Sequence, residues 1–517
     1  MKHLIKIEST PHGVLGVRHT GLDQQYCEAG ELVILEWQPD AKWGLQEAHY
    51  TDGDGNVTPI DLTRVKVDGV NVVAFVMPDK DITIGGTFKL FVIEDWTGSE
   101  AAFSIVGSFD VANLPTLDGF NDAGKVAFVK DTRKYATWDG YGWTYMDGKP
   151  VTPRYLTFTA NEDGSSVGFI VFNDGYDLPE DYKKPSLQYS TDDGKTWQDY
   201  DLQISDSVED ATKIELDEGE SVMFKGVNEN LAYFLEDDGD WLTTRCYVEG
   251  SVAASGDVTS LLNGVGGDIP LANNCYSFMF DGCTGLTQAP ALPATTLANN
   301  CYNGMFRGCT GLMQAPALPA TTLAQSCYSF MFSGCTGLTQ APALPATTLA
   351  NNCYNGMFNG CTGLTQAPTL PATTLANNCY NGMFNGCTGL MQAPALPATT
   401  LADYCYQNMF NGCTGLTQAP TLPATTLANG CYSFMFDGCT GITSHDVAAL
   451  NNSANTFNNN TSCASFTIHA DTPPTIGNNT ITGLKADCII YVPAESVDAY
   501  KAKQYWSARA SYIQAIQ

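Results

Sequence analysis

The second half of the chain is built from a unit of 26 residues that recurs seven times. Copies of C-Y-x-x-M-F-x-G-C-T-G begin at Cys275, Cys301, Cys327, Cys353, Cys379, Cys405 and Cys431. Between copies runs L-[TM]-Q-A-P-[AT]-L-P-A-T-T-L-A, which breaks only after the last copy. A unit this short cannot hold a core alone and must bury its apolar side against its neighbours. The repeat therefore predicts a solenoid in which each unit forms one coil.

Within one coil the sequence separates inward residues from turn residues. The apolar side chains expected inside are Met279, Phe280, Leu286, Leu292 and Leu297. Gly282 and Gly285 supply turns, and Pro290 and Pro293 bracket a short extended piece that favours a strand over a helix. The segment "LANNCYNGMF" leaves a helical turn and a simple arc open.

Each copy also carries a second cysteine, eight residues after the first: Cys283, Cys309, Cys335, Cys361, Cys387, Cys413 and Cys439. Metal binding is disfavoured because the spacing is not C-x-x-C and no histidine lies among the repeats. Disulfides are an alternative, but assembly in a cytoplasm disfavours them. The favoured interpretation is a column of buried thiols that pack on their copies in the next coil. The sequence thus predicts structural cysteines and neither a metal nor a cofactor.

Charge and length limit the classes of function. The chain has 517 residues and a net charge of −30, which indicates three or four domains and argues against a nucleic-acid partner. Between Cys275 and Thr440 only Asp281, Arg307, Asp403 and Asp437 are charged, so the repeats present a neutral surface of Thr, Asn, Gln, Ser and Tyr. No apolar run is long enough to insert into a membrane, and the N-terminus lacks a signal-peptide core, so synthesis in a cytoplasm is expected.

The repeats resemble a known family. The phrase "NGMFNGCTGLTQAPTLPATTLA" is similar to the BspA-like leucine-rich repeats of gut-bacterial surface proteins and of phages that infect such bacteria, over about residues 255–517. The ending "CIIYVPAESVDAYKAKQYWSARASYIQAI" resembles the C-terminal cap of that family, with Pro493 stopping a strand and Ser496 or Glu495 opening a helix. Val497, Tyr500 and Trp506 would form the apolar side of this helix. The resemblance implies adhesion or recognition without catalysis.

The first 92 residues alternate as strands, for example "GELVILEWQP", "NVVAFVMP" and "TFKLFVIE". The stretch "FVMPDKDITIGGTF" resembles the ending of small β-domains related to InlB-type B-repeats, which implies a spacer or attachment module. The segment "DGDGN", residues 52–56, suggests a calcium loop, but Val57 and Thr63 stand where that loop needs Gly and Glu. A hairpin turn is the favoured interpretation.

Residues 93–150 contain the phrase "KYATWDGYGWTYMDG", which predicts an aromatic hairpin. It is similar to short modules of phage tail and fibre proteins. Trp138 and Trp143 are candidate sugar-stacking residues, and the alternative is that they only hold the two strands together.

Residues 151–250 predict a further β-domain through "YLTFTA", "SVGFIVF", "SLQYS", "SVMFKG" and "LAYFLE". "STDDGKTW", residues 190–197, fits the Asp-box pattern S-x-D-x-G-x-T-W, which is structural in sialidase-like propellers. A single copy cannot build a propeller, so we expect one fastened hairpin. Asp192 would bond the turn backbone and Trp197 would pack below it.

The sequence shows no convincing active site. "GSSVG", residues 164–168, matches G-x-S-x-G, but strand-like residues follow where a nucleophile elbow needs a helix. The six histidines lack metal spacing, and the acidic residues lie in turn sequences and not in paired positions. We expect no enzyme, and a carbohydrate-active enzyme is the weakest alternative.

Together these features predict a mainly β protein: small β-sandwich-like N-terminal domains, then a leucine-rich-repeat solenoid with a C-terminal α/β cap. The expected divisions are a small β-domain (1–92), a linker with the hairpin (93–150), a β-sandwich-like domain (151–250), the solenoid (251–440), and degenerate repeats with the cap (441–517).

The predicted function is that of a phage virion protein, such as a tail fibre, head fibre or other peripheral protein. Its N-terminal domains would bind other virion proteins, and its repeats a host-surface glycan or protein. Rows of polar side chains would make the contacts, with the candidate tyrosines Tyr302, Tyr328, Tyr354, Tyr380 and Tyr406. A solubilising or packing face is the alternative for these rows, and a bacterial cell-surface adhesin is the alternative for the protein. Fibres are often trimeric, but no heptads enforce a trimer here.

Overall fold

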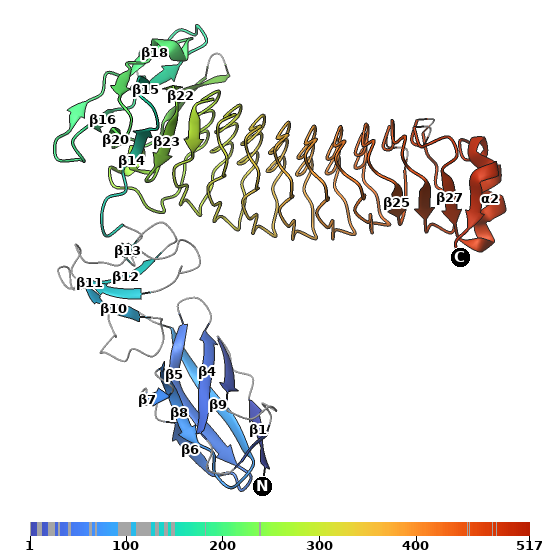
Figure 1. The fold of residues 1–517 in the computed structure, drawn as a ribbon, viewed down its shortest axis with the longest axis horizontal. Coiled ribbons are helices and arrows are strands. Elements are labelled where there is room, and N and C mark those ends of the chain that lie inside the picture. Colours follow the sequence, from blue (N-terminus) through green and yellow to red (C-terminus); the bar gives the residue numbers. More distant parts are fainter. Residues whose placement is uncertain are drawn as a thin grey trace. The chain divides into compact units, whose positions relative to one another are not determined.

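The computed structural model describes most of the second half of the chain and separate segments of the first. It covers residues 150–517 apart from 181, 237, 238, 452, 454, 478 and 482. Before these it covers 2–7, 13–18, 26–28, 32–39, 43–60, 65–67, 70–90, 105–109, 126–129, 134–138 and 143–145. The chain forms two compact units, Met1–Met146 and Asp147–Gln517, and is mainly β (Figure 1).

The first unit contains three described sheets. One has the order β3 (Tyr26–Glu28), β1 (Lys2–Ile7), β9 (Ile82–Leu90), β5 (Trp43–Asp52), β6 (Val57–Ile60). The next has the order β2 (Gly13–Arg18), β4 (Leu32–Pro39), β8 (Val70–Val76), β7 (Val65–Val67). The last runs β10 (Ile105–Phe109), β11 (Val126–Val129), β12 (Lys134–Trp138), β13 (Trp143–Tyr145).

Both hairpins predicted in this unit are present, and strands β12 and β13 pair antiparallel as the aromatic one. Strands β5 and β6 pair antiparallel around residues 53–56, and the Asp52 carboxylate accepts hydrogen bonds from the backbone N–H groups of Asp54 and Asn56 at 3.0 and 2.9 Å. These bonds hold the pKa of Asp52 low, at about 2, with the Asn56 contacts as the largest cause. Lys80 pairs with the carboxylates of Asp52 and Asp54. The "DGDGN" segment is therefore a closed hairpin turn with a lysine on its acidic groups.

The second unit begins with two sheets that pack face to face. One has the order β17 (Gln198–Asp199), β16 (Leu187–Ser190), β20 (Ser221–Gly226), β14 (Leu156–Ala160), β23 (Val252–Ser255), β24 (Leu286–Gln288). The other has the order β18 (Gln203–Ser205), β15 (Ser165–Phe172), β22 (Asp240–Glu249), β21 (Ala232–Leu235), with β19 (Ile214–Leu216) also on β15. The rings of Phe158, Phe169 and Phe224 meet between them at 5.0–6.1 Å. A 3-10 helix, η4 (Val208–Asp210), and a short helix, α1 (Ser260–Asn263), complete this part.

The repeats stack as successive coils, and the segment around each first cysteine is an arc of turns with no helix. In the coil of Cys353, the N–H groups of residues 352, 354, 356, 358 and 360 donate to carbonyls of the next coil at 2.7–3.0 Å. The N–H groups between them close turns within the same coil. Backbone φ is positive every fourth residue, at Asn352, Gly356 and Gly360. This alternation ties every coil to the next through its backbone.

The opposite side of each coil is extended but forms almost no regular strand. Isolated parallel bridges join Gln314 to Gln340 and Thr322 to Thr348, and these rows continue to Gln418 and Thr426. The strand expected between Pro290 and Pro293 is reduced to a bridge at Ala291. Proline has no N–H to donate, so a ladder cannot run through these positions.

Both ends of the stack are covered. At the first end β24, which belongs to the first coil, pairs parallel with β23, so the coils continue a sheet of the β-domain. At the last end a parallel sheet of β25 (Ser444–Val447), β26 (Ser465–Ile468), β27 (Ile489–Val492) and β28 (Ile513–Ala515) follows the repeats. Over it lie η5 (Ala494–Ser496), α2 (Val497–Ala502) and η6 (Ser507–Tyr512). Trp506 and Tyr500 are fully buried there.

The predicted cap is right in outline and wrong in one detail. Strand β27 ends before Pro493 and a helix follows, as expected. Ser496, one of the two expected residues, stands at the N-cap position of this helix, but its side chain makes no capping hydrogen bond, because its hydroxyl donates to the carbonyl of Asp471 at 2.5 Å. In the degenerate region Phe457 stacks on Phe436 at 5.9 Å, so the aromatic column runs on past the last full repeat.

Candidate functional site

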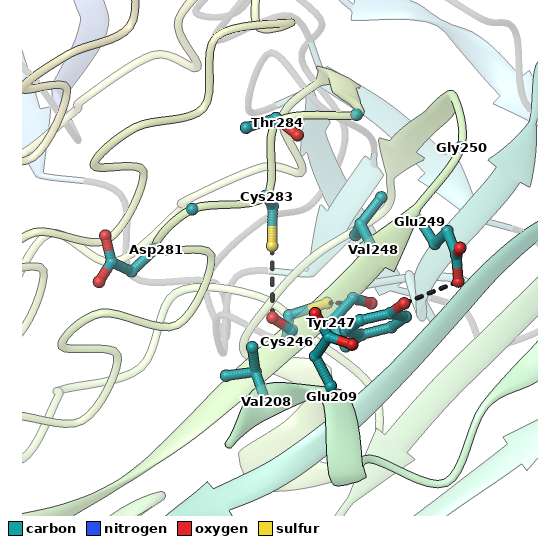
Figure 2. A pocket seen from close by; sticks show the side chains of 12 residues that line it. Val208, Glu209, Cys246, Tyr247, Val248, Glu249, Gly250, Asp281, Cys283 and Thr284 are labelled. Carbon is teal, nitrogen blue, oxygen red and sulfur yellow. Dashed lines mark hydrogen bonds between the residues drawn. The ribbon is translucent and has the colours of Figure 1, made fainter. Parts of the chain in front are cut away.

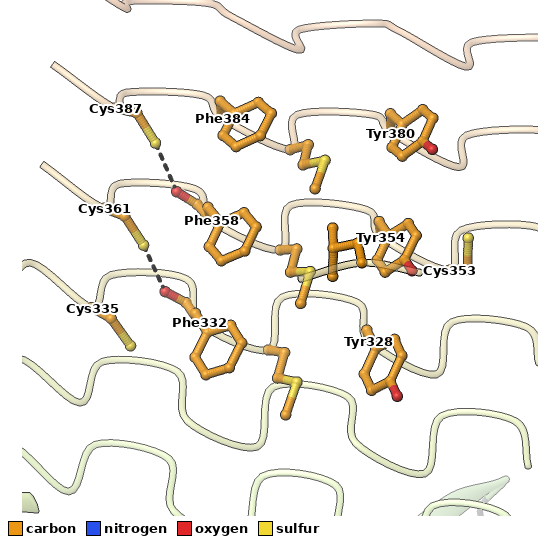
Figure 3. Packing of buried hydrophobic residues seen from close by; sticks show 14 of the residues in the cluster. Tyr328, Phe332, Cys335, Cys353, Tyr354, Phe358, Cys361, Tyr380, Phe384 and Cys387 are labelled. Carbon is orange, nitrogen blue, oxygen red and sulfur yellow. Dashed lines mark hydrogen bonds between the residues drawn. The ribbon is translucent and has the colours of Figure 1, made fainter. Parts of the chain in front are cut away.

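The inside of the stack is occupied by identical side chains in columns. Figure 3 shows three such coils, with a tyrosine, a methionine, a phenylalanine and a cysteine repeated one above the other. The second cysteine of a repeat donates its thiol hydrogen to the phenylalanine carbonyl of the preceding coil, as Cys361 does to Phe332 at 3.0 Å. Five further repeats show the same bond at 2.9–3.0 Å. The packing interpretation predicts buried cysteines, and the thiols are additionally hydrogen bonded between coils.

Burial also makes these thiols unreactive. The seventeen cysteines whose side chains are described are all free and buried. Burial raises the pKa of Cys335, Cys353 and Cys413 to about 12, and raises the pKa of Cys361 well above its usual value. Because the thiolate is the nucleophile and the metal ligand, a thiol with such a pKa does neither chemistry near neutral pH.

The tyrosines predicted as ligand-binding residues lie inside the stack, so that prediction is wrong. Their exposed fractions are 1–2 %, and successive rings stack at 5.6–6.3 Å. The residues concerned are Tyr302, Tyr328, Tyr354, Tyr380 and Tyr406. A ligand outside the coils cannot reach them, because the arc of turns covers the rings.

The hairpin tryptophans do not provide an exposed pair either. Trp143 pairs with Trp138 across β12 and β13, and its side chain is only 7 % exposed. The ring of Trp143 is therefore not accessible for the sugar stacking that was predicted for it. The side chain of Trp138 lies outside the described residues.

The outer side of the stack carries two rows of neutral polar side chains. Gln314, Gln340, Gln366, Gln392 and Gln418 form one row of exposed residues joined by backbone bridges. Thr322, Thr348, Thr374, Thr400 and Thr426 form the other. Among the described residues, no partner of these glutamine amides or threonine hydroxyls is found. Each row therefore offers donors and acceptors to an external ligand at every coil.

The few charges and many of the asparagines are used between coils. Arg307 donates to both oxygens of Asp281 in the preceding coil, at 2.8 and 2.6 Å. The side-chain oxygens of Asn377 and Asp403 accept the backbone N–H of the residue 26 positions later, at 3.2 and 3.0 Å. These contacts fix the register of the coils, and the glutamine and threonine rows keep amides and hydroxyls without a partner among the described residues.

The Asp-box residues form a structural hairpin. Asp192 accepts a hydrogen bond from the Thr196 backbone N–H at 2.9 Å and from the Thr196 hydroxyl at 2.6 Å. The Trp197 indole donates to the carbonyl of Gly194 at 3.0 Å, and the Lys225 ammonium lies 3.9 Å from its ring. The G-x-S-x-G match, residues 164–168, runs into strand β15 at Ser165, with the strand and no helix after it, and Ser166 is only 1 % exposed. Neither motif builds a reactive centre.

A groove of about 480 Å³ lies where the β-domain meets the first coil (Figure 2). Three carboxylates line it: those of Glu209, Glu249 and Asp281. The Tyr247 hydroxyl donates to Glu249 at 2.7 Å and lowers the pKa of that carboxyl, and Asp281 is held by Arg307. Glu249 also lies 3.8 Å from the ammonium of Lys213, so two of the three carboxylates are already partners of neighbouring cations and hydroxyls.

One carboxyl group in the described part of the chain has a raised pKa, and it is enclosed. Burial raises the pKa of Asp257 to about 6. Its oxygens accept hydrogen bonds from Thr259 and from the backbone of Gly267, and the residue has no exposed surface. Asp257 therefore fastens the first turn of the stack.

Across the described residues, no cluster of three or more histidine, cysteine or acidic side chains is arranged to hold a metal ion. In the same part of the chain, no helix has the length and apolarity needed to cross a membrane. The sequence matches no model of a known protein family and no curated protein.

Proposed function

We propose that this chain is a non-catalytic recognition protein of a phage particle, such as a tail fibre, head fibre or other peripheral protein. In this proposal residues 251–440 form a leucine-rich-repeat solenoid whose outer rows bind a glycan or protein on the host surface. The N-terminal domains would attach it to other virion proteins. The observation that carries the proposal is the pair of glutamine and threonine rows, which are exposed and have no partner in the part of the chain that the structure describes, on coils tied together by their backbones.

The physical case rests on repetition and rigidity. Equivalent amides and hydroxyls recur once per coil, so a polymer with a regular repeat can make the same contact several times. Because the coils are already ordered, binding loses little conformational entropy. Each contact is weak, and several in one ligand raise the affinity through effective concentration.

Two measurements test the proposal. Mass spectrometry of purified phage particles should detect this protein as a stoichiometric component, and its absence from particles would contradict the virion role. A host-polysaccharide array probed with the full chain should show binding. Presence in particles without binding to any host-surface glycan or protein would instead favour a packing role for the rows.

A further inference from the structure

A pocket of about 210 Å³ lies on the outer side of strand β22, beside the first coil. Successive side chains of a strand point to opposite faces. Trp241, Thr243 and Arg245 therefore share the outward face, while Leu242 and Cys246 enter the core. This alternation places an aromatic ring, a hydroxyl and a guanidinium in one row at the wall of the pocket.

The guanidinium of Arg245 lies over an aromatic ring and keeps donors that have no partner among the described residues. It lies 3.6 Å from the ring centre of Phe172 and 5.4 Å from that of Phe278. Its Nε donates to the Thr243 hydroxyl at 3.2 Å. Within the described part of the chain, no carboxylate forms an ion pair with it. A stacked arginine presents a rigid fork of N–H groups, and here that fork faces the pocket.

The remaining walls add an acceptor, a donor and a second ring. Asp174, in the loop after β15, is exposed and has no hydrogen-bond partner among the described residues. Asn274, from the first coil, contributes a mostly buried amide with the backbone at positive φ. The Tyr176 hydroxyl donates to Asp240 at 2.9 Å, which fixes both side chains at the rim.

From this arrangement we infer a second binding site, specific for one ring of a neutral sugar. A sugar ring has an apolar C–H face, which stacks on the indole of Trp241, and neighbouring hydroxyl groups at its edge. A hydroxyl can donate to the Asp174 carboxylate while its neighbour accepts from the Arg245 fork. The site combines an apolar platform with a few convergent polar groups, as small-molecule sites do.

Charge and size select the ligand. Asp174 and Asp240 face the pocket with the single cation Arg245, so an acidic sugar would meet more negative than positive charge. Pockets that enclose drug-sized ligands measure roughly 300–1,000 Å³, and this one is smaller. It therefore fits a single residue or a chain end, while the coil rows suit a longer polymer. The inference does not depend on binding by those rows.

The test probes the full chain against an array of neutral gluco-, galacto-, manno- and N-acetylhexosamine oligosaccharides together with uronic-acid oligosaccharides. Positive ligands are then titrated by calorimetry against Trp241→Ala and Arg245→Met. The methionine keeps an apolar stem between the two rings and removes the donors. Phe330→Ala is the matched control, because this ring is 39 % exposed on a later coil and outside the pocket.

We expect binding to a neutral oligosaccharide, a loss of at least tenfold in affinity for both pocket variants, and no change for Phe330→Ala. Unchanged affinity in both pocket variants, preference for acidic sugars, or no neutral ligand at all would overturn the inference. If Trp241→Ala fails to fold, Asp174→Ala replaces it, because Asp174 is exposed. We expect this variant to lose affinity for the neutral oligosaccharide several-fold, and an unchanged affinity would contradict the inference. If substitutions in the glutamine row abolish binding while the pocket variants bind normally, the pocket is not the binding site and the coil rows are.

Discussion

At the scale of single residues, backbone conformation decides which side chains of a coil point inward: φ is positive at Asn352 and Gly356, and Tyr354 between them is buried. The cysteines of the repeat motif and its Met-Phe pair, such as Met279 and Phe280, were expected in the core and lie there. Tyrosine was expected outside because it was grouped with the neutral polar side chains that recur once per coil. The positive φ at Asn352 and Gly356 turns the chain so that Tyr354 points inward, and a period of four in backbone conformation is invisible to hydrophobic patterning.

One prediction concerns the tyrosine hydroxyls. The hydroxyl of Tyr328 is buried and has no hydrogen-bond partner among the described residues. Because an unpaired buried hydroxyl is costly, Tyr328→Phe should leave the free energy of unfolding unchanged or raise it by about 1 kcal/mol. Tyr276→Phe is the control, since that hydroxyl donates to the Val258 carbonyl at 3.2 Å and its removal should cost about 1 kcal/mol. Urea unfolding followed by circular dichroism measures both, and equal losses would contradict the assignment.

A further residue-level prediction concerns the thiols. With the pKa of Cys353 and Cys413 raised to about 12, almost no thiolate is present at pH 8. Alkylation with iodoacetamide, followed by peptide mass spectrometry, should modify the repeat cysteines only when denaturant is added. Rapid labelling of several repeats in the native protein would show that the columns are open to solvent.

At the scale of elements, strands with a high content of apolar and β-branched residues were predicted, whether one face or both faces are buried. "SVGFIVF" and "SVMFKG" correspond to β15 and β20. The segment "DWLTTRCYVE" forms β22, and its half-buried Trp241 and Arg245 were missed because no motif marks them. The segment between Pro290 and Pro293 did not become a strand, because the two prolines have no backbone N–H to donate to an adjacent coil.

Coil spacing gives a prediction at this scale. A Cβ on Gly363 would lie 2.4 Å from the backbone carbonyl oxygen of Thr336 in the preceding coil, and this backbone cannot move aside. Gly363→Ala should therefore lower the free energy of unfolding by roughly 3 kcal/mol. Gly382→Ala is the control: its φ is +61° and nothing lies within 4 Å of the added carbon, so only about 1–2 kcal/mol of backbone strain is expected. A larger loss for Gly382→Ala would contradict the tight coil contact.

The C-terminal cap gives a pH prediction. His445 is buried among Phe436, Phe457 and Phe466, with its Nε2 2.8 Å from Asn460, and burial lowers its pKa to about 4. The unfolded chain takes up a proton near pH 6.5 that the folded chain refuses. Stability from this group is thus complete above pH 6.5 and falls toward pH 4, by up to about 3 kcal/mol.

The measurement is the pH dependence of the unfolding free energy in the parent and in His445→Gln. The pH dependence contributed by Asp257 has the opposite sign, because its raised pKa of about 6 favours the folded state as the pH falls. This contribution is the same in both proteins and cancels in the comparison. The parent should therefore lose more stability than the variant between pH 7 and pH 5. Equal slopes would mean that His445 is accessible to protons.

At the scale of the whole molecule, the repeat predicted the stacked coils of the second half, but no pattern predicted how the β-domain joins them. Strand β24 lies in the first coil and pairs with β23 of the domain before it, and Phe158 contacts Phe280 across that junction at 6.3 Å. Such contacts depend on tertiary placement that one sequence does not reveal. They make Asp147–Gln517 one compact unit.

The charge distribution gives a prediction at this scale. Only four charged residues lie between Cys275 and Thr440, and Arg307 and Asp281 are already paired. Ligand binding by the coil rows should therefore change less than about threefold between 50 and 500 mM salt, since screening acts on charges. Affinity measured across this range by surface plasmon resonance checks it, and a steep salt dependence would place recognition elsewhere.

The most direct test of recognition by the outside of the stack is to charge one row and measure binding. The triple variant Gln340→Glu, Gln366→Glu, Gln392→Glu places carboxylates on three neighbouring coils and leaves the core intact. On the same host-polysaccharide array, we expect binding to fall at least tenfold while the melting temperature changes by only a few degrees. Binding equal to that of the parent, in a variant that remains folded, would contradict the account.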